Sequence, residues 1–340
     1  MPPNPTSVPH RAVLTVDEYY AGVRVGEVGI LARALTLIES TSPHHQMLAE
    51  ELLTRLLPHT GAAVRVGITG VPGVGKSTFI ETLGLHLIRR GLRVAVLTVD
   101  PSSEISGGSI LGDKTRMTKL ASELAAYIRP SPSAGTLGGV ARKTREGMLA
   151  CEAAGFQVIL IETVGVGQSE TVVSEMTDCF LALMLPGAGD ELQGIKRGLL
   201  ELVDVIAVNK ADGPMRPAAE LAAQQYRTAL RLLGGRRSAP AVFTCSAMQK
   251  EGIDRAWEAI EGHCSRMTAT GELAEKRRRQ NLRWLWALVD DQVRLAIHAH
   301  PAVRKIQTDL EREVLAGSLA ATAAARRILA AFGQPHDGLN

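Results

Sequence analysis

The feature that most constrains this chain is the sequence Gly-Val-Pro-Gly-Val-Gly-Lys-Ser at residues 70–77, which separates two stretches of different periodicity. The stretch before it, 64–69, is short, apolar and rich in β-branched residues, which predicts a strand. The stretch after it, 76–90, has apolar residues at helical spacing and ends before Gly91. Glycines let successive N–H groups turn inward, and the following helix adds the positive end of its dipole. We therefore predict a loop that binds the phosphates of a nucleotide.

Each residue of this phosphate-binding loop has an expected part in binding. Lys76 is placed to neutralise the β- and γ-phosphates, and the Ser77 hydroxyl is a ligand for Mg²⁺. Thr78 is expected on the α-phosphate side. The other predicted nucleotide contacts come from the loop residues Gly73, Val74 and Gly75. The alternative is a glycine turn that only closes a strand–helix unit, and the motif in this context argues against it.

Short apolar runs alternate with helical stretches from residue 64 to about residue 268. Nearly continuous apolar runs of this kind are typical of strands that helices cover on both faces. We predict an α/β fold with a doubly wound, mostly parallel sheet of the P-loop NTPase kind, with its ligand at the carboxyl ends of the strands. Besides 64–69 and 76–90, strands are expected at 93–99, 156–161, 179–185, 205–208 and 241–244, and helices at 113–126, 139–154, 190–201, 216–233 and 253–267.

Helical patterns flank the α/β region on both sides. A first helix is expected to begin at Thr15, which has the spacing of a capping box with Glu18. We predict three parts, which are a tail with a helical extension at 1–62, a nucleotide-binding domain at 63–268 and a C-terminal helical arm at 269–340.

The expected helix at the start of the C-terminal arm carries two apolar stripes. Either the arm packs on its own sheet, or it forms an interface between two copies of the chain. Two stripes on one helix need two partners, which favours a homodimer. The first stripe consists of Leu282, Leu285, Val289, Val293 and Ile297, and the second of Trp284, Leu288 and Leu295.

A predicted strand leads into the sequence Asn-Lys-Ala-Asp, in which Asp212 is placed to recognise guanine. Its carboxylate can accept two hydrogen bonds from the guanine edge, and adenine lacks that pair of donors. The stem of Lys210 can cover the purine ring, and Asn209 can tie its loop to the phosphate-binding loop. Ser246 and Ala247, after the next strand, can offer N–H groups to guanine O6. A solvated turn is the alternative for so short a motif, but its place in the chain predicts GTP as the nucleotide.

Three acidic residues are candidates for the metal and for switching. Asp100 and Glu162 each follow a predicted strand, where a carboxylate can hold Mg²⁺ directly or through water. Asp113 follows a glycine-rich loop and could instead cap a helix. Gly165 has an N–H that could sense the γ-phosphate. The water-positioning residue is not assigned, because Gln168 lies three positions beyond Gly165, so we expect slow hydrolysis that a partner accelerates. The residues predicted to act in catalysis are Lys76, Asp100, Asp113 and Glu162.

Together these segments resemble the MeaB/ArgK family of P-loop GTPases, which are related to metallochaperone GTPases. The resemblance covers nearly the whole chain and rests on 70–78, 99–103, 162–170 and 209–212, of which 162–170 is the most specific. It implies hydrolysis of GTP to GDP and phosphate with Mg²⁺. It also implies a homodimer that is a chaperone of adenosylcobalamin-dependent methylmalonyl-CoA mutase, gating loading of its cofactor and protecting it from inactivation.

The resemblance further implies an additional switch at 186–196. Asp190 and Lys196 would signal from this segment to the partner protein. The alternative is a strand-to-helix loop with a capping acid and a solvated lysine.

Composition limits the class of partner and the compartment. A net charge of +3 does not indicate a nucleic acid or an anionic membrane as partner. Four scattered cysteines favour a reducing compartment, and no apolar run has the roughly 20 residues that span a bilayer. With no secretory leader recognisable in the first ten residues, we expect a cytoplasmic protein.

Three other functions compete with this interpretation. A metallochaperone for nickel or zinc should carry a histidine run or a Cys-x-x-Cys cluster, and the close histidine pairs are only His44 with His45 and His298 with His300. A kinase for a small molecule such as arginine would usually prefer ATP, against which the Asn-Lys-Ala-Asp sequence argues. A scaffold that binds GTP without turnover would be separated by kinetic assays with and without the mutase.

Overall fold

The computed structural model describes residues 14–99, 117–130, 137–163, 169–186, 197–233 and 239–333. Contacts within the chain separate two compact units, Met1–Lys276 and Arg277–Asn340. The three-part division with boundaries after residues 62 and 268 stays a prediction.

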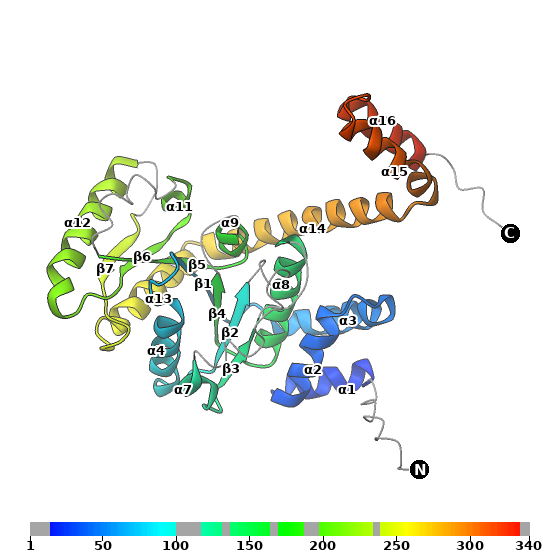
Figure 1. Ribbon diagram of the computed structural model, residues 1–340. Coiled ribbons are helices and arrows are strands. Elements are labelled where there is room, and N and C mark those ends of the chain that lie inside the picture. The colour runs from blue at the N-terminus through cyan, green and yellow to red at the C-terminus, as the bar shows by residue number, and fades with distance from the viewer. Residues whose placement is uncertain are drawn as a thin grey trace, which may run out of the picture. The chain divides into compact units, whose positions relative to one another are not determined.

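The first unit is built on a sheet of seven strands, and every pairing between them is parallel (Figure 1). Their order is β3-β2-β4-β1-β5-β6-β7, so β1 lies between β4 and β5. This confirms the predicted doubly wound α/β fold, with a sheet that is parallel throughout. The strands are β1 (Val64–Gly70), β2 (Val94–Val99), β3 (Ala126–Arg129), β4 (Val158–Thr163), β5 (Cys179–Met184), β6 (Val205–Val208) and β7 (Ala241–Thr244).

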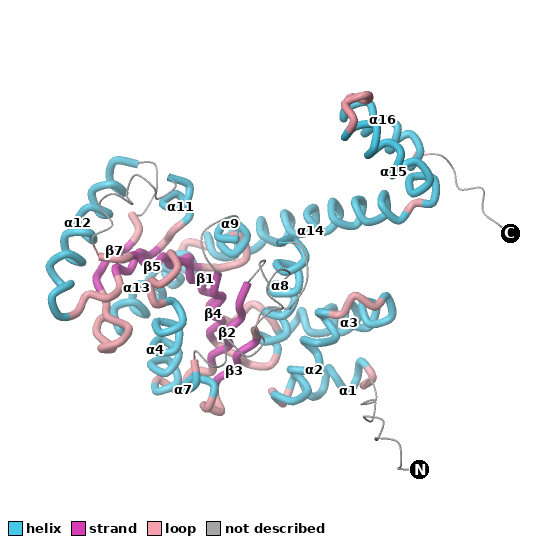
Figure 2. Tube along the Cα trace, viewed as in Figure 1, coloured by secondary structure: helices cyan, strands magenta, loops and turns pink. Residues whose placement is uncertain are grey.

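Side chains of successive strand residues enter two separate cores, one on each face of the sheet. On one face, Ile68 and Leu160 share a core with residues of α4 (Lys76–Arg89), α7 (Thr118–Ala121) and α13 (Ile253–Ala269). Helices therefore cover both sides of the strands, as Figure 2 shows. On the other face, the core includes residues of α8 (Leu137–Ala153), α9 (Ser169–Ser174), α11 (Arg197–Leu202) and α12 (Arg216–Leu233).

Three N-terminal helices belong to the same core as α8. They are α1 (Val16–Arg24), α2 (Val28–Glu39) and α3 (Pro43–Leu56), followed by a short 3-10 helix, Leu57–His59. The predicted capping box at the start of α1 is present, because Thr15 and Glu18 each bond the other's main-chain N–H. An ion pair between Glu39 and Arg129 also joins α2 to β3, with Arg129 Nε 3.0 Å from Glu39 Oε1.

The helices at the C-terminus are α14 (Glu272–Ala299), α15 (Pro301–Leu315) and α16 (Ala321–Phe332). The expected restart of the chain at Pro301 is present, and α15 packs against α16. Along α14, several large apolar side chains are exposed, including Leu285 at 53% and Trp286 at 60%. None of the helices among the described residues combines the length and the apolar composition that a membrane span requires.

The sequence prediction was wrong between β2 and α8. A helix was expected at 113–126, whereas the described part of this stretch holds the single turn α7 and then strand β3, which pairs with the edge of β2. A strand of four residues is too short to show a period, and a neighbouring strand decides its conformation. The strand expected at 156–161 begins two residues later, at Val158, and continues to Thr163.

Candidate functional site

The phosphate-binding loop connects the end of β1 to the start of α4, at the carboxyl edge of the central strand. Two of its glycines are required by their surroundings. Gly70 has a φ of 152°, and a Cβ there would lie 2.5 Å from the main-chain oxygen of Leu183 in β5. Gly75 has a φ of 95°, and its Cβ would lie 2.9 Å from Asn209 Nδ2. Only glycine allows the neighbouring segments of the same chain to approach the loop this closely.

Lys76 is the first residue of α4, and its side chain folds back over the loop. Its Nζ donates hydrogen bonds to the main-chain oxygens of Gly70, at 2.6 Å, and Val71, at 3.3 Å. The pKa of Lys76 is lowered, because burial is the largest effect on it. The nearby carboxylates of Glu162 and Glu170 act in the opposite direction and offset part of this shift. An ammonium group that main-chain oxygens hold in place of water is suited to meet the negative charge of a phosphate chain.

Ser77 and Glu162 bring two oxygen donors together beside the loop. The Ser77 hydroxyl donates to Glu162 Oε1 at 3.2 Å. Glu162 lies near the end of β4, in register with Ile68 of β1 and Thr98 of β2, and is 5% exposed. The pairing of β4 between β1 and β2 thus directs this carboxylate to the start of α4. A hydroxyl and a carboxylate are the type of ligand that a hard cation prefers.

The amide of Asn209, just after β6, connects three loops. Its Nδ2 donates to the main-chain oxygen of Val74 at 2.8 Å, and its Oδ1 accepts from the N–H of Ala247 at 3.0 Å. Asn209 is 2% exposed. Because both ends of the amide are used, the loops after β1, β6 and β7 are held at fixed separations.

Asp212 lies at the same edge and is held by the loop after β7. Its Oδ2 accepts a hydrogen bond from the Ser246 hydroxyl, which itself accepts from the N–H of Gln249 at 3.1 Å. Two main-chain hydrogen bonds between Ser246 and Glu251, each of 3.0 Å, close this loop. Lys210 has a φ of 60° and is exposed. The arrangement leaves an acid with a fixed carboxylate next to an exposed lysine.

The described members of the predicted site therefore come from the carboxyl ends of four strands and from the first turn of α4. Thr78, also in that turn, is exposed. Of the other predicted site residues, Asp100, Asp113, Gly165, Asp190 and Lys196 lie outside the described residues, as does Gln168.

Three residues at this edge had no role in the sequence analysis. The hydroxyl of Thr163 donates to that of Thr69 at 2.9 Å, and both residues are fully buried at the ends of neighbouring strands. Glu170, in α9, is 7% exposed and raises the pKa of Lys76. The sequence offered two signals for them, which were the position of Thr69 and Thr163 at or just after the end of a predicted strand and the place of Thr163 and Glu170 within segment 162–170.

Comparison with known proteins identifies the group to which this arrangement belongs. The model of a family described as "Methylmalonyl Co-A mutase-associated GTPase MeaB" matches residues 31–302. The chain belongs to the MeaB family of GTPases. The predicted family and the predicted GTPase activity are thereby confirmed.

Individual relatives of this MeaB-family GTPase are similar over most of their length. A probable GTPase of Mycobacterium tuberculosis is 55% identical over 317 residues, covering 93% of this chain and 94% of the relative. GTPase ArgK of Escherichia coli is 50% identical over 281 residues, covering 82% and 85%. The mouse methylmalonic aciduria type A homolog, a mitochondrial protein by name, is 45% identical over 333 residues, covering 94% and 80%.

A solved structure gives the same fold. The crystal structure of a LAO/AO transport system kinase is 38% identical to the chain, with a TM-score of 0.74, and the match covers 94% of this chain and 99% of that one.

Proposed function

We propose that this MeaB-family GTPase binds GTP with Mg²⁺ at the carboxyl edge of its sheet, hydrolyses it to GDP and phosphate, and acts as a chaperone of methylmalonyl-CoA mutase. The observation that carries the nucleotide part is the Asn209 amide. It joins the loop suited to phosphates to the two loops suited to guanine, with hydrogen bonds of 2.8 and 3.0 Å.

The phosphates would lie against the N-terminus of α4. The main chain of Gly73, Val74 and Gly75 and the positive end of the helix attract them. Lys76 would exchange its two main-chain acceptors for phosphate oxygens. Because Lys76 is partly withdrawn from water, its attraction for charge that develops on the γ-phosphate is screened less than at an exposed site. Thr78 would contact the α-phosphate side.

The base would be selected by Asp212. The Ser246 hydroxyl holds one carboxylate oxygen and so fixes the direction of the acid. A guanine edge offers it two N–H donors, whereas adenine lacks that pair, and each hydrogen bond that the acid then fails to make costs about 1–3 kcal/mol. The stem of Lys210 would cover one face of the ring, and the N–H of Ala247 or Ser246 would approach O6.

Ser77 and Glu162 fit a magnesium ion by the chemistry of their donors, a hydroxyl and a buried carboxylate 3.2 Å apart. We propose that they hold it together with Asp100, and that Asp113 also acts in catalysis. Magnesium bound there supplies positive charge to the β- and γ-phosphates during hydrolysis. Gly165 is proposed to sense the γ-phosphate.

The chaperone role rests on family membership, since the matched family is described as associated with methylmalonyl-CoA mutase. We propose that the chain gates the loading of adenosylcobalamin and protects the mutase, and that Asp190 and Lys196 pass the nucleotide state to it. The exposed apolar side chains of α14 support the proposed homodimer, because a patch of this kind is unusual on a monomer. Sedimentation of the full chain at several concentrations tests it, and a monomer throughout would contradict it.

The decisive experiment for the function measures GTP turnover with and without purified methylmalonyl-CoA mutase. We expect slow intrinsic turnover that the mutase accelerates. The Lys196→Ala variant should keep the intrinsic rate and lose part of the acceleration. No acceleration of the parent would contradict the mutase as partner, and equal acceleration of parent and variant would contradict the role of Lys196. The kinase alternative predicts instead that a small molecule such as arginine is phosphorylated. In the same assay with arginine added in place of the mutase, GTP turnover would then depend on this acceptor.

A further inference from the structure

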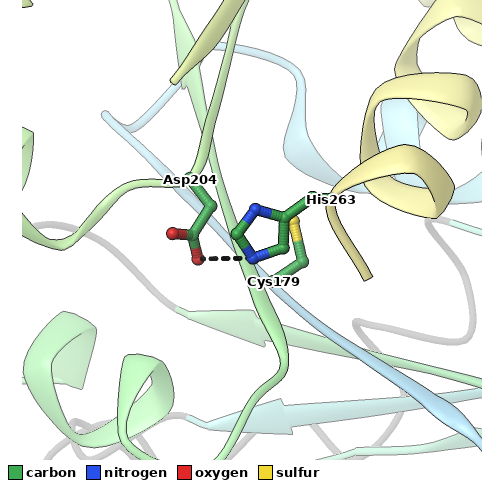
Figure 3. A group of neighbouring side chains, drawn as sticks. All are labelled: Cys179, Asp204 and His263. Carbon is green, nitrogen blue, oxygen red and sulfur yellow. Dashed lines mark ion pairs between the residues drawn. The ribbon is translucent and has the colours of Figure 1, made fainter. Parts of the chain in front are cut away.

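A second group of reactive side chains lies at the opposite edge of the sheet from the nucleotide site. Cys179 is the first residue of β5, Asp204 directly precedes β6, and His263 lies on α13. The amino ends of parallel strands share one edge, so Cys179 and Asp204 are brought together there, and α13 adds the imidazole. Figure 3 shows the three side chains converging, with the ring of His263 directed toward the carboxylate of Asp204.

The donor atoms of these side chains are close enough to share a ligand. The sulfur of Cys179, an oxygen of Asp204 and a nitrogen of His263 all lie within 4.8 Å of one another. His263 Nε2 lies 3.8 Å from Asp204 Oδ2, too far for a hydrogen bond. This nitrogen is buried and has no hydrogen-bond partner among the described residues. A buried polar atom without a partner is costly, and a bound metal ion is one way to satisfy it.

We propose that Cys179, Asp204 and His263 bind one zinc ion, with water completing its coordination. Sulfur, imidazole nitrogen and carboxylate oxygen are the ligands that zinc takes in proteins, at roughly 2.0–2.3 Å. Tetrahedral ligands at such distances lie about 3.3–3.8 Å apart, so the side chains need to close by up to about 1.5 Å. Magnesium would not compete, because it prefers oxygen ligands only.

The side chain of Asp204 has two further polar contacts among the described residues, of which one fixes its carboxylate and the other opposes the binding of a metal ion. Asp204 Oδ2 accepts a hydrogen bond from the N–H of Phe180 at 3.0 Å, which fixes the carboxylate. Lys276 Nζ lies 3.8 Å from the same oxygen and donates to the main-chain oxygen of Asp178 at 2.8 Å. When no metal is bound, the ammonium group of Lys276 is therefore the counter-ion of Asp204. A zinc ion that binds there has to overcome repulsion from this positive charge.

The thiol of Cys179 imposes a second condition. Burial, assisted by the charge of Asp204, raises its pKa well above the usual value, so it carries its proton when no metal is bound. Binding forms the Zn–S bond and breaks the S–H bond, and the proton leaves to solvent. The ion then links α13 to the beginnings of β5 and β6. Its effect is on the stability of this unit, since the ligands lie at the edge away from the nucleotide loops.

Cobalt titration of the full chain, freed of metal and without nucleotide, tests the site. Tetrahedral Co²⁺ with a thiolate ligand gives a sulfur-to-metal absorption band, which reports Cys179 directly. We expect one equivalent of Co²⁺ to produce this band and one equivalent of Zn²⁺ to abolish it and raise Tm. A parent protein that gives no such band, or that binds only at histidines elsewhere, overturns the proposal.

Variants at the side chains make the test specific. His263→Gln should weaken Co²⁺ binding by about tenfold or more, whereas His86→Gln, which alters another partly buried histidine, should not. Cys179→Ser should remove the sulfur band, and Cys264→Ser, which alters the neighbouring buried cysteine, should keep it. The Lys276→Met variant should bind Co²⁺ more tightly than the parent, because the positive charge that repels the ion is gone. Unchanged binding in both His263→Gln and Lys276→Met overturns the proposal without relying on the buried cysteine.

Discussion

Replacement of Asn209 by alanine tests the connection on which the nucleotide site depends. The substitution removes the donor to Val74 O and the acceptor for the N–H of Ala247, both at buried positions. A buried group left without its partner costs about 1–3 kcal/mol, so two such groups should lower the free energy of unfolding by about 3 kcal/mol. A unit of the size of Met1–Lys276 loses about 2 °C of Tm per kcal/mol, so Tm should fall by roughly 5 °C.

The same variant should bind GTP more weakly, because the loops for phosphate and guanine are no longer held at a fixed separation. Thermal unfolding and GTP turnover, each with the parent in parallel, measure the two effects. Gln249→Ala is the matched control, since it truncates an exposed amide in the neighbouring loop and should change stability by no more than about 0.5 kcal/mol. If Asn209→Ala keeps the Tm and the KM for GTP of the parent, the amide does not hold the site together.

Further predictions concern the phosphate-binding loop. Lys76→Ala should reduce GTP turnover by about 10²-fold or more while the circular dichroism of the fold is kept, because a charge directed at the phosphates is lost; full activity would contradict that role. Gly75→Ala should lower stability by more than the roughly 1–2 kcal/mol of left-handed strain, since its Cβ meets Asn209, whereas Gly73→Ala should cost only the strain, because no described atom lies within 4 Å of its Cβ. Equal losses of Tm would contradict the contact. Thr163→Val should lower the free energy of unfolding by about 1 kcal/mol in urea titrations, because the buried hydroxyl pair with Thr69 is lost, and an unchanged midpoint would contradict this.

Most strands of the sheet could be predicted from the sequence, because they are buried on both faces and are therefore largely apolar. Runs such as Val205–Val208 contain only apolar residues, and their bounds in the structure are those expected. The starts of some helices could also be predicted, as with the capping box at Thr15 and the start of α15 at Pro301. In each case the signal is local, so neighbouring residues alone decide the conformation.

Features that depend on distant residues were not accessible in this way. Strand β3 exists because β2 offers it a free edge, and its four residues have no period of their own. The burial of Lys76 and the influence of Glu170 on it arise only when β4 and α9 lie beside the loop. Likewise, the group of Cys179, Asp204 and His263 joins three elements that are far apart in the sequence.

The most direct test of the nucleotide site compares GTP, XTP and ATP as substrates for the parent and for Asp212→Asn. The parent should favour GTP strongly by kcat/KM. In the variant, the amide can offer a donor to the second oxygen of xanthine, so the preference should shift from GTP to XTP. The loss of one hydrogen bond between the side chain and the base predicts a change of about tenfold or more in the ratio of the two kcat/KM values. A variant that keeps the selectivity of the parent for GTP would contradict the account of how this edge of the sheet recognises its nucleotide.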